Sequence, residues 1–138
     1  MPAKDIYHDK VKNALIKDGW TITHDPYILT FGQRSVYVDL AAEPVLAAEK
    51  GNEKIAVEIK SFRGESDIHD LEAAVGQYVF YRSLLVRYEP GRKLFLAVPI
   101  SIFLSTLDEP IARPVIEDLP VSLLAFDPEQ EVIIKWKT

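Results

Sequence analysis

The stretch Ile55-Ala56-Val57-Glu58-Ile59-Lys60 is the most informative part of the chain, because it alternates as a strand with one apolar face and carries an acid and a lysine on the other. Successive side chains of a strand point to opposite faces, so Glu58 and Lys60 project from the same face. An earlier stretch, Val36-Tyr37-Val38-Asp39-Leu40, has the same pattern and places Asp39 opposite its apolar side chains. If these two predicted strands pair, two carboxylates and one amine meet at one edge of a sheet.

Such a group of side chains favours metal-dependent hydrolysis of a phosphodiester. Two carboxylates hold a hard cation such as Mg²⁺ or Mn²⁺, and the carbonyl of Ile59 can add a third oxygen. A lysine beside them orients or deprotonates water, or offsets the charge that develops on phosphate. The alternative is that Asp39, Glu58 and Lys60 are solvated residues on a half-exposed sheet face.

The composition narrows the classes of protein and of metal site. The chain has 138 residues, 48% of them apolar and 27% charged, as expected of one soluble globular domain. No apolar run approaches the roughly 20 residues of a membrane helix, and the start lacks the apolar stretch of a secretion signal, which favours the cytoplasm. There is no cysteine, and the three histidines do not share a ligand spacing, so an oxygen-ligated ion is favoured over zinc.

The net charge of −5 argues against a protein that grips DNA alone. DNA-binding surfaces usually carry an excess of Lys and Arg that displaces counterions. Contact with nucleic acid is therefore expected to be weak and local, or to depend on a partner that supplies positive charge.

The remaining elements predict an α/β fold, a restriction-endonuclease-like mixed sheet flanked by helices. The segment 42–50 is compatible with either a helical turn or an extended strand. The long helix between two strands predicts a right-handed parallel crossover. Helices are expected at 5–18, 67–87 and 99–104, and strands at 20–24, 27–31, 36–40, 55–60, 93–98, 121–126 and 131–136.

The long helix at 67–87, capped by Ser66 or Asp67, carries two further features. Phe80 and Leu84 lie off its main apolar stripe, so we expect a second cover from self-association or a partner. Gln77 and Tyr81 are four residues apart and project together, with Asp70 and Ala74 on the same stripe. We expect that stripe to lie away from the main apolar one.

The first helix offers two further candidates for the site, His8 and Asp9. The alternative is a solvent-facing helix start, where an acid is favourable for the helix dipole.

The order Asp39, then Glu58-Ile59-Lys60, resembles the core of the PD-(D/E)xK nuclease superfamily, and Gln77 with Tyr81 resembles the auxiliary Gln-x-x-x-Tyr motif of several of its branches. The superfamily's proline before the Asp is Val38 here. Taken whole, the chain is similar to the XisH family of cyanobacteria, known as excision-controlling factors for the fdxN DNA element. The resemblance rests on residues 3–9, 17–26, 57–62 and 70–78, with Val11, Ala14 and Leu15.

The resemblance implies one endonuclease-like domain over residues 1–138 and a role in programmed DNA excision beside a recombinase and a companion protein, XisI. Three hypotheses follow. The first is a Mg²⁺- or Mn²⁺-dependent DNA endonuclease in which Asp39, Glu58 and the Ile59 carbonyl hold the ion, Lys60 acts on water, and Gln77 and Tyr81 support them. The second is a non-catalytic accessory factor that uses the nuclease scaffold to bind DNA or partner proteins. The third is an oligomeric scaffold built on the long helix.

Overall fold

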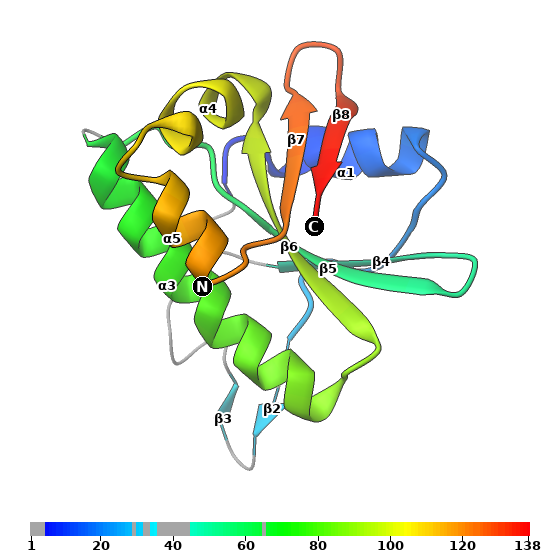
Figure 1. Cartoon of the computed structure of the whole chain (residues 1–138). Coiled ribbons are helices and arrows are strands. Elements are labelled where there is room, and N and C mark those ends of the chain that lie inside the picture. The colour runs from blue at the N-terminus through cyan, green and yellow to red at the C-terminus, as the bar shows by residue number, and fades with distance from the viewer. Residues whose placement is uncertain (1–4, 29, 32–33, 36–44, 65) are drawn as a thin grey trace.

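A mixed β-sheet with helices on both faces forms the protein, shown in Figure 1 as a computed structural model that describes residues 5–28, 30–31, 34–35, 45–64 and 66–138. The α/β class with a mixed sheet flanked by helices is therefore confirmed. The helices are α1 (His8–Lys17), α3 (Asp67–Tyr88), α4 (Ile100–Leu104) and α5 (Arg113–Asp118), with a 3₁₀ turn η1 (Thr106–Asp108). The strands are β1 (Thr21–His24), β2 (Thr30–Phe31), β3 (Arg34–Ser35), β4 (Val45–Lys50), β5 (Glu53–Ile59), β6 (Arg92–Pro99), β7 (Leu123–Asp127) and β8 (Val132–Lys137).

Six strands form the main sheet, in the order β1-β4-β5-β6-β7-β8, and β2 pairs with β3 separately. The expected crossover is confirmed, because β5 and β6 pair in parallel with α3 between them in the chain. β6 and β7 are also parallel, whereas β4 with β5 and β7 with β8 are antiparallel. None of the described helices has the length and hydropathy to cross a bilayer.

The two faces of the sheet bury separate apolar cores. Residues of α1 pack on one face with Leu46, Val57 and Phe95. α3 packs on the other, against side chains that include Ala56 and Leu96, and α5 adds Ile116 to that core. Figure 1 shows α3, α4 and α5 together on one side and α1 on the other. β5 and β6 thus lie between two layers, which explains their near-continuous apolar sequence.

β5 lies between β4 and β6 in the main sheet. The segment 42–50, left open between helix and strand, contains β4, which pairs with β5 from Lys50↔Glu53 to Val45↔Glu58. β6 occupies the other edge. Both edges of β5 are therefore filled along 54–58. The predicted strand 36–40 itself lies outside the described residues.

The long helix buries a wider face than the sequence predicts. Ser66 is its N-cap and accepts a hydrogen bond from the His69 amide at 3.2 Å. The stripe of Ala74 and Tyr81 was expected to lie away from the apolar face, but both are buried in the core. Val86, which we expected on the main apolar stripe with Ile68, Leu71 and Tyr78, is 66% exposed instead. The prediction was wrong because the polar groups on this stripe made it look solvent-exposed, whereas it faces the core.

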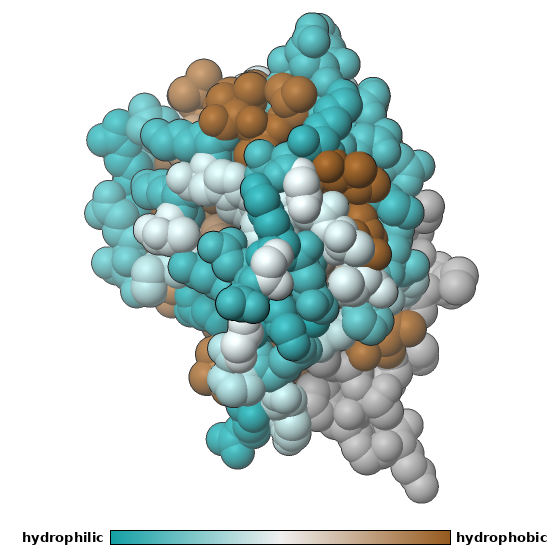
Figure 2. Space-filling model, turned by 90° about the vertical axis from the view of Figure 1, so that its right-hand side faces the viewer, coloured by the Kyte–Doolittle hydropathy of each residue, from teal (hydrophilic) through white to brown (hydrophobic). Residues whose placement is uncertain are grey.

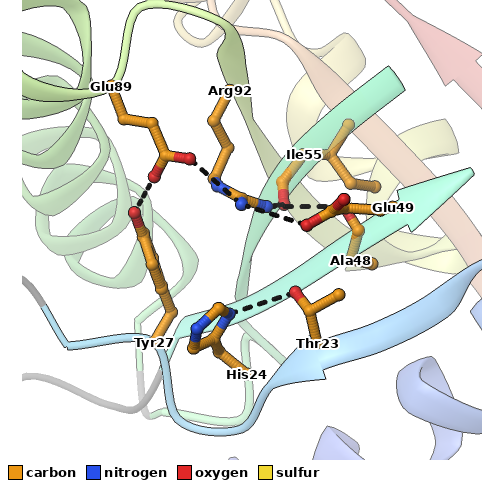
Figure 3. Close-up of polar contacts among 8 residues, drawn as sticks. All are labelled: Thr23, His24, Tyr27, Ala48, Glu49, Ile55, Glu89 and Arg92. Carbon is orange, nitrogen blue, oxygen red and sulfur yellow. Dashed lines mark hydrogen bonds and ion pairs between the residues drawn. The ribbon is translucent and has the colours of Figure 1, made fainter. Parts of the chain in front are cut away.

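The buried side chain of Arg92 links β6 to neighbouring elements through hydrogen bonds and ion pairs, at the end of the sheet where β5 begins (Figure 3). Arg92 donates to the Ile55 carbonyl at 3.0 Å and pairs with Glu89 at 3.1 Å and Glu49 at 3.6 Å. Tyr27 lies under its guanidinium and hydrogen-bonds to Glu89. The cluster connects α3, β4, β5, β6 and the segment after β1.

The face turned to the viewer in Figure 2 is dominated by hydrophilic residues, and its hydrophobic residues form separate small groups. This agrees with the mean hydropathy of zero for the whole chain.

Candidate functional site

Glu58 lies inside the sheet, one residue before the end of β5. Its neighbours in register are Val45 of β4 and Leu96 of β6, and its side chain is 1% exposed. It shares the α3-facing side of the strand with Ala56. A buried carboxylate costs several kcal/mol unless it is neutralised or bound by a polar partner. The alternative that the sequence left open, a solvated Glu58 on a half-exposed sheet face, is thus excluded.

The charge of Glu58 affects the pKa of Tyr81, a buried side chain of α3. Burial, and secondly the charge of Glu58, raise the pKa of Tyr81 to about 12. Its hydroxyl is thus neutral at physiological pH and able to donate a hydrogen bond. The sequence placed these two residues in one site, and the structure brings them together across the interface between helix and sheet.

Gln77, one turn before Tyr81, supplies an unsatisfied polar atom. Its Oε1 is buried and has no hydrogen-bond partner among the described residues. Buried acceptors of this kind are uncommon and usually point to a ligand, an ion or an ordered water. The sequence prediction that Gln77 and Tyr81 share one helix face is consistent with this placement.

Lys60 follows β5 directly and extends its alternation. Its amide donates to the carbonyl of Ala97 at 3.0 Å, so the backbone still belongs to the sheet. Its side chain lines a cavity of about 210 Å³ with Asp70 and Ala73 of α3. Glu58 and Lys60 therefore face the same helix, as the strand pattern predicts.

Of the two other predicted metal ligands, the structure describes Ile59 but not Asp39. Asp39 lies outside the described residues. Ile59 is the last residue of β5, and its side chain is buried in the core on the α1 side. The described part of the chain has no group of three or more Asp, Glu, His or Cys side chains arranged to hold a metal ion. The metal set predicted from the sequence includes Asp39, so it stays a prediction.

The first helix contributes differently from the expectation. The ring of His8 is buried, and its Nε2 lies 2.7 Å from a carboxylate oxygen of Asp25, which also contacts Lys12 at 3.1 Å. Asp9 is exposed. Among the described acids of the N-terminal segment, Asp5 reaches the end of β5, where it accepts a hydrogen bond from the Ser61 amide at 2.9 Å. No sequence pattern links residues so far apart, so this contact was missed.

The mixed sheet between helical layers defines an α/β protein. Its candidate site lies between β5 and α3, where a buried acid near the end of a central strand is followed two residues later by a lysine. The family model described as XisH protein matches residues 1–134, and the chain belongs to that family. The resemblance to the XisH family noted from the sequence is thereby confirmed.

Two solved structures are similar over nearly the whole chain. An XisH family protein from Nostoc punctiforme PCC 73102 is 39% identical, with a TM-score of 0.88, over 97% of this chain and 100% of the other. An fdxN element excision controlling factor protein from Anabaena variabilis is 38% identical, with a TM-score of 0.88, over 98% of this chain and 100% of the other. A search of curated proteins found no significant match.

Proposed function

We propose that this chain controls the excision of a DNA element and does so as a metal-dependent DNA endonuclease. Residues 1–138 would act as one endonuclease-like domain of the PD-(D/E)xK type, together with a recombinase and a companion protein of the XisI kind. The name of the relative from Anabaena variabilis, an fdxN element excision controlling factor, supports the biological role.

The observation that carries the catalytic part is the set of polar groups buried between β5 and α3. The carboxylate of Glu58 and the amide oxygen of Gln77 are both held away from solvent. Apolar side chains would make such a core more stable, so the burial of a carboxylate here supports a functional role for it. The unpaired oxygen of Gln77 supports a bound ligand. Oxygen donors without thiolate or imidazole suit Mg²⁺ or Mn²⁺.

Each residue has a role that its position permits. Asp39, Glu58 and the Ile59 carbonyl would hold the cation, which supplies charge stabilisation for the phosphodiester and an activated water. Lys60 would orient or deprotonate that water from its place in the cavity. Tyr81, neutral because its pKa is raised, would donate a hydrogen bond, and Gln77 would accept one from a water molecule in the site.

A plasmid-nicking assay with Mg²⁺ or Mn²⁺ tests the proposal. The wild type, Asp39→Asn and Lys60→Ala are compared with and without the companion protein. We expect nicking by the wild type and its loss in both variants, while Lys54→Ala, an exposed lysine on the same strand, keeps it. Nicking that survives both substitutions would exclude this site.

The net charge of −5 favours the second candidate, an accessory factor that binds DNA or partner proteins without cleaving. Exposed apolar residues on α3, Phe80 at 48% and Val86 at 66%, offer a surface for a partner or a second copy. Absence of nicking in every combination, with intact binding to the recombinase or to XisI, would favour this role.

A further inference from the structure

The loop that carries Lys60 away from β5, residues 60–64, has an unusual backbone. Phe62 has φ of 58°, in the left-handed region that non-glycine residues avoid, and its side chain is 8% exposed in the core under α3. Such a conformation is unfavourable for a residue with a Cβ and persists only where the surroundings enforce it. Two carboxylates, one from each side of the loop, provide that enforcement.

The first carboxylate belongs to Asp70, in the first turn of α3. It accepts a hydrogen bond from the Gly64 amide at 2.9 Å. A Cβ at residue 64 would lie 2.4 Å from Oδ1 of Asp70, so the close approach requires glycine. Asp70 also lines the cavity that holds Lys60.

The second carboxylate belongs to Asp5, ahead of α1. Oδ2 accepts from the Ser61 amide at 2.9 Å, and Oδ1 accepts from the Tyr7 amide at 2.8 Å. Both oxygens are thus engaged by backbone donors. The loop is held at Ser61 by the α1 side of the molecule and at Gly64 by the α3 side.

We propose that Asp5 and Asp70 are positioning residues that fix the loop from Lys60 to Gly64 and so keep the Lys60 side chain in its cavity. They act through hydrogen bonds to the backbone and are not metal ligands. The inference rests on the proposed function for its catalytic consequence and deepens it, because it names what holds the lysine in place.

The contrast between alanine and asparagine at Asp70 tests the proposal. Asparagine keeps an acceptor oxygen for the Gly64 amide, whereas alanine removes it. We expect Asp70→Ala to lower hydrogen-exchange protection of the Gly64 amide about tenfold or more, and the nicking rate by roughly ten- to a hundredfold, with the Kd for Mn²⁺ unchanged. Asp70→Asn should restore most of the protection and the rate. Glu72→Ala, an exposed acid on the same helix, is the matched control.

Two further variants keep the test independent of one substitution. Gly64→Ala substitutes neither acid, but its Cβ would displace the Asp70 carboxylate. It should therefore reproduce the effect of Asp70→Ala. Asp5→Asn keeps one of the two acceptor oxygens, so it should retain protection of either the Ser61 or the Tyr7 amide, whereas Asp5→Ala should lose both. Equal loss of rate and of Mn²⁺ affinity in the Asn and Ala variants would make the acid a ligand and overturn the proposal.

Failure of this inference can be told apart from failure of the proposed function. If the wild type neither nicks DNA nor binds Mn²⁺, the endonuclease assignment fails, while the exchange experiment still reports on the loop. Protection lost in Asp70→Ala and kept in Asp70→Asn supports the positioning role. Protection unchanged in Asp70→Ala and Gly64→Ala overturns it.

Discussion

Tyr81 of α3 and Glu58 of β5 are electrostatically coupled across the interface between helix and sheet. Burial is the larger cause that raises the pKa of Tyr81 to about 12, and the charge of Glu58 is the second. The coupling joins two residues of different elements into one candidate site.

The first prediction concerns this pair. Glu58→Gln should lower the pKa of Tyr81 and leave it above 10, because burial remains. Because the pKa of Tyr81 is raised in the folded state, the contribution of its neutral hydroxyl to the stability of the fold is complete below pH 10. It is lost as the pH rises to about 12. Phenolate absorbance, with Tyr81→Phe to assign the signal, measures the shift. An unchanged pKa would mean that the two groups do not interact.

The second prediction concerns Asp25. Burial alone would raise its pKa, but the hydrogen bond from Lys12 and the neighbouring His8 outweigh it and lower the pKa from 3.8. The stabilisation from Asp25 is therefore present above pH 3.8 and is lost as the pH falls through the lower folded-state value.

Asp25→Asn should accordingly destabilise the protein at neutral pH. The difference in the free energy of unfolding between variant and wild type should shrink as the pH falls below 3.8. Urea denaturation over a pH series measures it. Asp118→Asn, at an exposed position on α5, is the control and should show no such trend. A difference that does not depend on pH would contradict the assignment.

The third prediction separates function from packing at Gln77. Gln77→Leu removes the unpaired buried oxygen, so the free energy of unfolding should be unchanged or higher. Affinity for Mn²⁺ and the nicking rate should fall. Thermal unfolding and Mn²⁺ titration are the two measurements, and a stable variant with full affinity would remove Gln77 from the site.

The fourth prediction concerns the link between β6 and β7. The hydroxyl of Tyr78 donates to the Leu94 carbonyl at 3.2 Å and accepts from the Ser122 amide at 2.9 Å. Tyr78→Phe leaves both backbone groups buried without this partner and should cost about 1–3 kcal/mol. Tyr7→Phe, which keeps the ring contact with Phe126, should cost less in the same denaturation experiment.

The strand and helix pattern of the sequence was sufficient for the fold class. The alternation around Glu58 and the continuous apolar run of β6 indicated their positions, because side-chain periodicity reflects burial directly. β4 was ambiguous, since the Ala-rich run from Val45 to Lys50 has neither a clear period of two nor a helical one. Its pairing with β5 depends on long-range contacts that local patterns do not contain.

The site was partly predictable for the same reason. Glu58, Lys60, Gln77 and Tyr81 follow from positions within single elements. The contact of Asp5 with Ser61 and the fit of Gly64 against Asp70 depend on how loops pack on their neighbours. His8 was a candidate by its place in the first helix, but the structure pairs it with Asp25.

In the proposed site, Asp39 and Glu58 converge on a divalent cation. Anomalous diffraction from crystals soaked with Mn²⁺ tests it most directly. We predict one peak about 2.1 Å from a carboxylate oxygen of each residue. An Asp39 side chain on the opposite face of the sheet from Glu58, with no peak between them, would contradict the account.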